Sequence, residues 1–287
     1  MRARPGRLLA MALALTAIST ARTGAACTSK VTPSTCIDAD ELWPHAGAGP
    51  FFSIGATSTT PTGRLAFGVV TSWESEPVGL RIASADPHGT TFFAVEDAVD
   101  VTLLFAVGVT DRLELTVAAP MTVVQRGAGL APYDGRDEDL TRSALRDVRL
   151  GLALALVRPR ADGTGFGLAA RFEFASPTAS SSAFAGSGTV TYAPTLTASY
   201  RYGRVLASAE AGARARGVTD FGSTRVGSAA SAELGVAVDV LRKKLGTVAL
   251  EAFALPSLVS QRPSEVDASD GAAHASVPAE WIASVSS

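Results

Sequence analysis

Charged residues in this chain recur at alternate positions within long stretches that are otherwise apolar. Arg112 and Glu114 share one parity, as do Arg171 and Glu173, while the opposite parity of each stretch carries no charge. Opposite charges on one face of a strand can pair with each other or line a polar interior. The candidate site residues selected in this way are Asp100, Arg112, Glu114, Arg149, Arg171, Glu173, Arg201, Glu210, Arg214, Glu233, Asp239 and Glu251.

Side chains that could do catalysis or bind metal are sparse. His45, His88 and His274 share no metal-ligand spacing with one another or with the cysteines, and no phosphate-binding loop, nucleophile elbow or zinc motif is present. We therefore expect no catalytic residue, no metal site and no cofactor, and each histidine on the surface. A barrel-type hydrolase of the outer membrane is the less favoured alternative.

The elements that must position the charges are β-strands. Residues 98–109 and 112–123 alternate between apolar and small or polar side chains around a short turn at Thr110 and Asp111, which predicts a β-hairpin. The same alternation predicts further strands at 51–57, 64–73, 147–157, 165–175, 190–202, 204–216, 226–240, 246–255 and 277–285. Residues 78–83 and 91–95 could extend the flanking strands as a hairpin.

Strand length and connection length favour a membrane barrel. Most of the long runs reach about the 9–11 residues that a tilted strand needs to cross a bilayer. Short turns at 110–111, 158–163, 203 and 241–245 alternate with longer connections at 74–97, 126–145, 176–188, 217–225 and 257–275. Short periplasmic turns and long external loops have this asymmetry. We predict an all-β fold, an antiparallel up-and-down transmembrane β-barrel of about ten strands, or twelve in a complete relative. A secreted, soluble β-sandwich that acts as a binding module is the alternative, because one solvated face gives the same alternation.

The first 26 residues have the features of a secretory signal peptide, with three early arginines, an apolar run and small residues before Cys27. Its removal takes away four arginines and no acidic residue, which changes the net charge from −2 to about −6. Such a chain is not basic enough to bind nucleic acid. We expect residues 27–50 to be a periplasmic N-terminal segment and residues 51–287 to form the barrel.

The two cysteines, Cys27 and Cys36, both follow the expected cleavage point. In an oxidising periplasm they could form a disulfide that closes one small loop. The alternative is a lipid on Cys27, because Ala25 and Ala26 precede it as in the end of a lipobox, although Gly24 stands where an aliphatic residue is usual. The disulfide is the favoured prediction.

Several short motifs resemble a group of bacterial outer-membrane barrels. They are the stretch 108–115, Ala119-Pro120, the stretch 147–151, Ala185-Gly186, the stretch 200–204 and the stretch 279–281. Over residues 36–285 the chain resembles porin-like "transporter" proteins and the N-terminal barrels of the OmpA family, in particular myxobacterial-type members. The resemblance implies a location in the Gram-negative outer membrane. It also implies contact with its lipid and lipopolysaccharide and with the barrel-insertion machinery. These barrels commonly end in an aromatic residue, whereas this chain ends in Ser287, so either ten strands close the barrel or the chain is truncated after Val285. No oligomeric state is predicted.

Two functions fit an interior lined by these charges. A charged constriction would make a narrow porin-like channel for small solutes, whereas a salt-bridge ladder would plug a structural barrel. The pattern favours the plugged barrel and names no solute. In either case Leu152 and Phe172 should face lipid, and Arg149 and Arg171 should face the lumen.

Overall fold

The computed structural model describes residues 34–47, 49–82, 89–134, 140–160, 163–180, 183–221, 224–240, 247–259 and 279–286. The expected signal peptide, Cys27, His88 and His274 lie outside these residues. No helix in the described part of the chain is long and apolar enough to cross a membrane.

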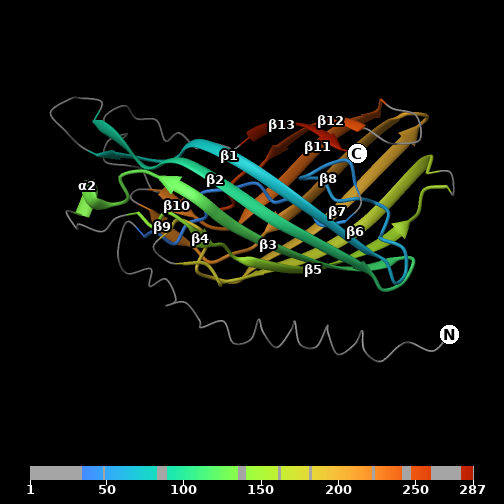
Figure 1. Cartoon of the computed structure of the whole chain (residues 1–287), viewed down its shortest axis with the longest axis horizontal. Coiled ribbons are helices and arrows are strands. Elements are labelled where there is room, and N and C mark those ends of the chain that lie inside the picture. The colour runs from blue at the N-terminus through green and yellow to red at the C-terminus, as the bar shows by residue number, and fades with distance from the viewer. Residues whose placement is uncertain are drawn as a thin grey trace.

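One antiparallel sheet dominates the fold, and its strands pair in chain order (Figure 1). Its strands are β1 (Leu65–Ile82), β2 (Thr90–Gly108), β3 (Leu113–Arg126), β4 (Ala144–Leu145), β5 (Val148–Val157), β6 (Gly165–Ser176), β7 (Thr191–Tyr202), β8 (Val205–Arg214), β11 (Ala229–Asp239), β12 (Thr247–Ala254) and β13 (Ala279–Ser286). A small hairpin of β9 (Thr219–Phe221) and β10 (Thr224–Val226) and the single turn α2 (Ala131–Asp134) lie in long connections. The prediction of an all-β, up-and-down antiparallel fold is confirmed, because a sandwich with Greek-key connections would not pair its strands in chain order.

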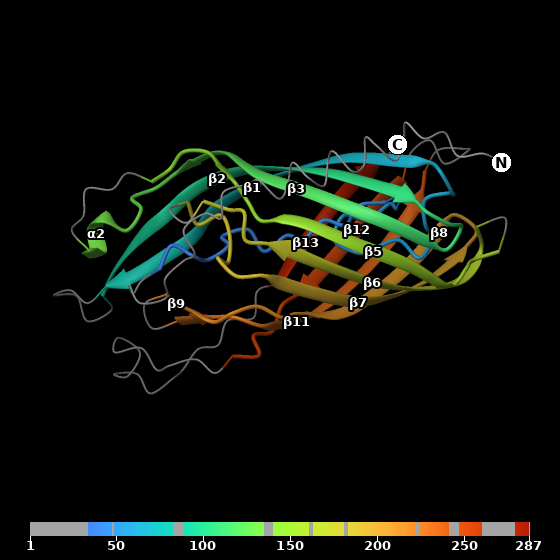
Figure 2. The same ribbon diagram turned by 90° about the horizontal axis from the view of Figure 1, so that it is seen from below.

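The sheet curls around residues 34–47 and 49–61, as both views show (Figures 1 and 2). Pairing runs from β1 at one edge to β13 at the other, with only the short β4 outside this order. The described residues form no strand ladder between β1 and β13. The long connections, with α2 and β9, gather at one end, which we call the loop end, and the short turns gather at the opposite turn end (Figure 1).

The hairpin extension expected from residues 78–83 and 91–95 is confirmed, because β1 continues to Ile82 and pairs there with the start of β2 at Thr90. The register of β1 shifts between Ser75 and Val78, where Glu76 has a φ of 56°. Pro77 has no N–H for the ladder, so the strand bulges there without ending. The strand expected at 51–57 is wrong, because these residues form no strand and lie inside the curled sheet.

Side chains along the strands alternate between an apolar outer face and a small or polar inner face. In β11, Leu234, Val236 and Val238 are exposed, whereas Glu233, Ala237 and Asp239 are buried. The outer face of the other strands carries exposed apolar residues as well, among them Phe67, Trp73, Leu152, Leu154, Phe172, Tyr192, Tyr202 and Leu250. Large apolar side chains are thus exposed on most strands of the sheet, which is unusual for a soluble monomer.

We predict that cysteine labelling will separate the two faces at neighbouring positions of β5. Leu152 is 41% exposed, whereas Ala153 is 1% exposed and lies opposite Glu114 and Arg171 in register. A lipid-soluble maleimide should therefore label Leu152→Cys in liposomes and leave Ala153→Cys unlabelled. The reverse pattern would mean that the sheet is inside out.

Arginine variants at the same two positions test how tightly the interior is packed. Leu152→Arg should cost about 2–4 kcal/mol near the bilayer midplane. A wet lumen would tolerate Ala153→Arg better, but the space beside Ala153 is filled, so we expect this variant to be at least as damaging. Urea unfolding from liposomes measures both changes.

Candidate functional site

The predicted charged residues gather on the inner face of the sheet, and only Arg112 lies outside it. Asp100, Glu114, Arg149, Arg171, Glu173, Glu210, Arg214, Glu233, Asp239 and Glu251 are all buried. Arg201 is half-buried and pairs with Asp239 at 2.6 Å. Arg112 is exposed, because β3 begins one residue later, at Leu113, and leaves Arg112 in the turn. Whether these charges line a solute path stays a prediction.

The interior is occupied by the chain's own N-terminal part, which we call the luminal segment (residues 34–47 and 49–61). At the loop end the backbone N–H of Ala39 donates to the carbonyl of Phe184 at 2.9 Å. At the turn end the hydroxyl of Thr59 donates to the carbonyl of Asp111 at 3.0 Å. The segment therefore runs the length of the interior, from the loop end to the start of β1. We predicted a periplasmic location for residues 27–50, and the structure places residues 34–47 of that range within the curled sheet.

Buried carboxylates of the strands hold the backbone N–H groups of the luminal segment. Glu251 accepts hydrogen bonds from the N–H of Phe52, Ser53 and Ile54 at 2.9–3.4 Å, and from the Ser53 hydroxyl at 2.8 Å. In the same way Glu210 accepts from the N–H of Gly55 at 2.8 Å, and Glu114 from the N–H of Thr60 at 2.7 Å. These carboxylates take the place of ladder partners for a backbone that is not in a strand.

Buried arginines of the strands hold the carbonyl groups of the same segment. Arg149 donates to the carbonyl of Pro44 at 3.1 Å, and Arg171 to that of Ala46 at 3.4 Å. Arg214 likewise donates to the carbonyl of Glu41 at 2.9 Å. The guanidinium carbons of Arg149 and Arg214 also lie over the ring of Trp43, 4.4 and 4.9 Å from its centroid. Trp43 is thus a cation–π anchor between two strands.

Small residues in the wall of the sheet make room for this segment. A Cβ added at Gly235 would lie 2.7 Å from side-chain atoms of both Ile54 and Phe51. A Cβ at Gly108 would lie 2.1 Å from the carbonyl oxygen of Thr60. The segment therefore packs directly against the backbone of β11 and β2.

His45 is the one basic side chain of the luminal segment, and it bridges two strands. Its Nδ1 lies 3.2 Å from a Glu173 oxygen on β6, and its Nε2 lies 2.9 Å from a Glu210 oxygen on β8. The indole N–H of Trp43 donates to the second oxygen of Glu173. The expectation that His45 is a surface residue is wrong, because it is buried between these two carboxylates.

The electrostatics of this bridge keep His45 charged. Burial alone would lower the pKa of the imidazole, but the carboxylates of Glu210 and Glu173 outweigh that effect and raise the pKa to about 9. The imidazolium therefore donates to both carboxylates at neutral pH.

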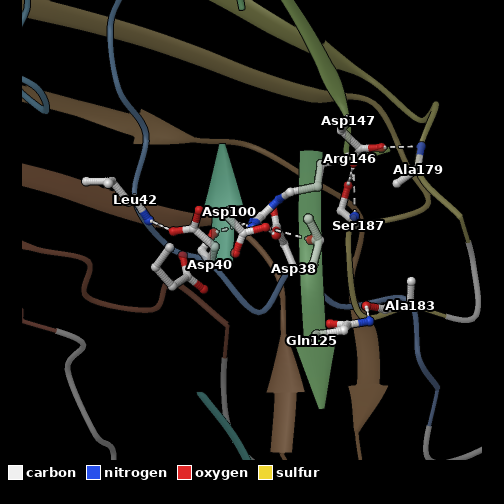
Figure 3. Close-up of polar contacts among 12 residues, drawn as sticks. Asp38, Asp40, Leu42, Asp100, Gln125, Arg146, Asp147, Ala179, Ala183 and Ser187 are labelled. Atoms are coloured by element: carbon white, nitrogen blue, oxygen red, sulfur yellow. Dashed lines mark hydrogen bonds and ion pairs between the residues drawn. The ribbon is translucent and has the colours of Figure 1, made fainter. Parts of the chain in front are cut away.

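Arg146, between β4 and β5, ties the loop end of the luminal segment to the sheet (Figure 3). It pairs with Asp38, with Asp40 at 3.0 Å and with Asp100 of β2 at 3.1 Å. Its neighbour Asp147 accepts from the backbone N–H groups of Ala179 and Ser187 at 3.1 and 3.0 Å. The pair 146–147 therefore holds a long loop and the luminal segment together.

One group of acidic side chains has a spacing that could hold a metal ion. Asp40, Glu74 and Asp100 each place a carboxylate oxygen within 4.8 Å of the others. Two of them, Asp40 and Asp100, already pair with Arg146, so a cation would have to share them with a guanidinium. Cys36 is in a disulfide, while Cys27 lies outside the described residues.

The comparisons with known proteins leave the family open. No family model matches this chain, and no curated protein matches it in sequence. A similar solved structure is the crystal structure of an outer membrane channel from Pseudomonas putida F1. It has 19% sequence identity and a TM-score of 0.49, and the match covers 70% of this chain and 75% of that chain. A likeness at this level establishes neither family nor function, so the resemblance to OmpA-family barrels stays a prediction.

We predict that the His45 bridge stabilises the fold in a defined pH range. Because the pKa of His45 is about 9 in the folded state and 6.5 in the unfolded chain, its contribution is full below pH 6.5 and is lost as pH rises through 9. The free energy of unfolding should fall by up to about 3 kcal/mol across this range. His45→Gln should remove that part of the pH dependence, measured by urea unfolding of the detergent-folded protein. Trp43→Phe is the matched control, since it loses a hydrogen bond to Glu173 but no titrating group. Equal pH slopes in wild type and His45→Gln would refute this role.

Proposed function

We propose that this protein is an integral outer-membrane β-barrel channel that its own luminal segment closes. Support for the membrane comes from the apolar outer face of the sheet and from strand connections that alternate between long and short. Further support comes from the charged side chains of the interior, which contact other groups of the protein and not lipid.

The observation that carries the proposal is the way the luminal segment fills the interior. It is bound by side chains of β3, β5, β6, β8 and β12, but it joins the sheet by no continuous ladder. Within the segment, Asp38 forms an isolated β-bridge, and Thr62, directly after the segment, forms another. An element held by side chains can leave without unpairing any strand of the sheet, and its departure would leave a passage lined by charge.

A permanently plugged structural barrel is the second candidate. The cluster of Arg146 with Asp38, Asp40 and Asp100 favours it, because breaking a buried ion pair by removing one partner typically costs about 3–5 kcal/mol. The two candidates differ in one measurable property, which is whether the segment can be displaced from a folded barrel.

The location is tested by fractionation. We expect the protein in the outer-membrane fraction, with an electrophoretic mobility that changes on heating, as folded barrels show. Recovery of folded protein from the periplasm without detergent would refute the proposal and favour the soluble alternative.

We predict that the wild type is closed in a planar bilayer and that displacing the segment opens it. Gly55→Leu should do so, since even a Cβ at Gly55 would lie 2.7 Å from Arg171 Nε and 3.0 Å from Glu210 Oε2. Ser58→Leu is the matched control, because Ser58 is exposed and the added bulk meets no wall. Deletion of residues 34–57 should give the largest conductance.

The open channel should prefer cations. The inner face carries seven of the predicted carboxylates against four arginines, once the exposed Arg112 is left out. Arg171→Gln or Arg214→Gln in the deletion variant should increase the cation preference, measured as the reversal potential in a salt gradient. Silent bilayers from the folded deletion variant would refute the channel and favour the structural barrel.

A further inference from the structure

A small cavity lies between the luminal segment and the wall, beside Trp43. Its volume is about 30 Å³, enough for roughly two water molecules or one monatomic ion. Its lining carries six charged residues, which are Asp38, Asp40, Arg146, Asp147, Arg149 and Arg216.

Five of these six side chains already form hydrogen bonds or ion pairs with other groups of the protein. Arg146 pairs with both Asp38 and Asp40. Asp147 accepts two backbone N–H groups, and Arg216 donates to a backbone carbonyl at 2.9 Å and lies 3.6 Å from a carboxylate oxygen. No carboxylate of the cavity is therefore left to receive a cation.

Arg149 is the exception. Its residue is 4% exposed, and its Nη2 donates to the carbonyl of Pro44, but its Nε and Nη1 are buried without a hydrogen-bond partner among the described residues. Both oxygens of Glu173 are taken by Trp43 and His45, and no carboxylate in the described part of the chain lies within 4 Å of the Arg149 guanidinium. Burying a guanidinium with two N–H groups that lack hydrogen-bond partners is costly.

We propose that this cavity binds one small monovalent anion, chloride under physiological conditions, on an unpaired N–H group of Arg149. The small volume favours a monatomic anion over a larger one, and an unpaired N–H group on a buried guanidinium is a strong donor to such an anion. Because Arg149 also holds Pro44, the bound anion stabilises the luminal segment in its closed position. The site belongs to the folded protein and does not depend on conduction.

A heavier halide makes the ion visible. Full-length protein is refolded and crystallised in bromide, and diffraction is measured at the bromine absorption edge. We expect an anomalous peak within hydrogen-bond distance of Arg149 Nε or Nη1. A water molecule at that position without anomalous signal would overturn the proposal.

Thermal unfolding gives an independent measurement. At equal ionic strength, bromide or chloride should raise the unfolding temperature of the wild type by about 2–4 °C over gluconate, which is too large for the cavity. Arg149→Gln should abolish this difference. Arg214→Gln should keep it, because Arg214 also lies over Trp43 and donates to the segment but does not line the cavity. If Arg149→Gln does not fold, the proposal is still tested by the anomalous map of the wild type and by the halide-dependent change in the unfolding temperature of Arg214→Gln. Equal halide shifts in wild type and Arg149→Gln would overturn the proposal.

Discussion

The structure depends on one constraint, that backbone polar groups removed from water need hydrogen-bond partners. The strands meet this requirement through their ladder, but the luminal segment inside the sheet cannot. Its N–H groups are met by the carboxylates of Glu251, Glu210 and Glu114, and its carbonyls by the guanidinium groups of Arg149 and Arg171. The charged side chains of the inner face therefore supply the hydrogen-bond partners of an irregular stretch of backbone. If these side chains paired chiefly with each other, the N–H and C=O groups of that stretch would lack partners.

In the proposed channel, the same arrangement makes the closed and open forms discrete. When the luminal segment is in place, each carboxylate that binds it is buried and satisfied, and Glu251 is 0% exposed. Partial withdrawal would leave buried charges without partners, which typically costs about 3–5 kcal/mol for each broken pair. Complete withdrawal admits water, which solvates the carboxylates and the guanidinium groups together. Intermediate positions are therefore the least stable, and we expect opening to be cooperative.

Much of the sheet can be predicted from sequence because the period of two is a local signal. Each strand places its charges on one side, so the shared parity of Arg171 and Glu173 is enough to identify the buried face of β6. The luminal segment gives no such signal: its side chains follow no strand or helix period, and its partners are distant in the sequence, 54 residues away for Thr60 and Glu114 and 165 for His45 and Glu210. For this reason sequence patterns do not identify Trp43, His45 and Arg146 as site residues. The N–H and C=O groups that explain the wall charges are present in almost every residue, so sequence patterns cannot reveal which of them need side-chain partners.

The two ends of the luminal segment are held by different kinds of interaction, and this difference decides at which end opening can begin. At the turn end the chain continues into β1, and Gly63 and Arg64 share backbone hydrogen bonds with Gly108. At the loop end the segment contributes Ile37 to an apolar cluster that includes Val95, Phe184 and Phe221, and Arg146 pairs with the adjacent Asp38 and Asp40. The turn end is thus fixed covalently, whereas the loop end depends on noncovalent packing against residues of long connections. Long connections are the part of a barrel that tolerates movement best. A ligand or partner that rearranges the contacts of Phe184 and Phe221 would therefore loosen the loop end of the luminal segment. The rest of the barrel would not need to change.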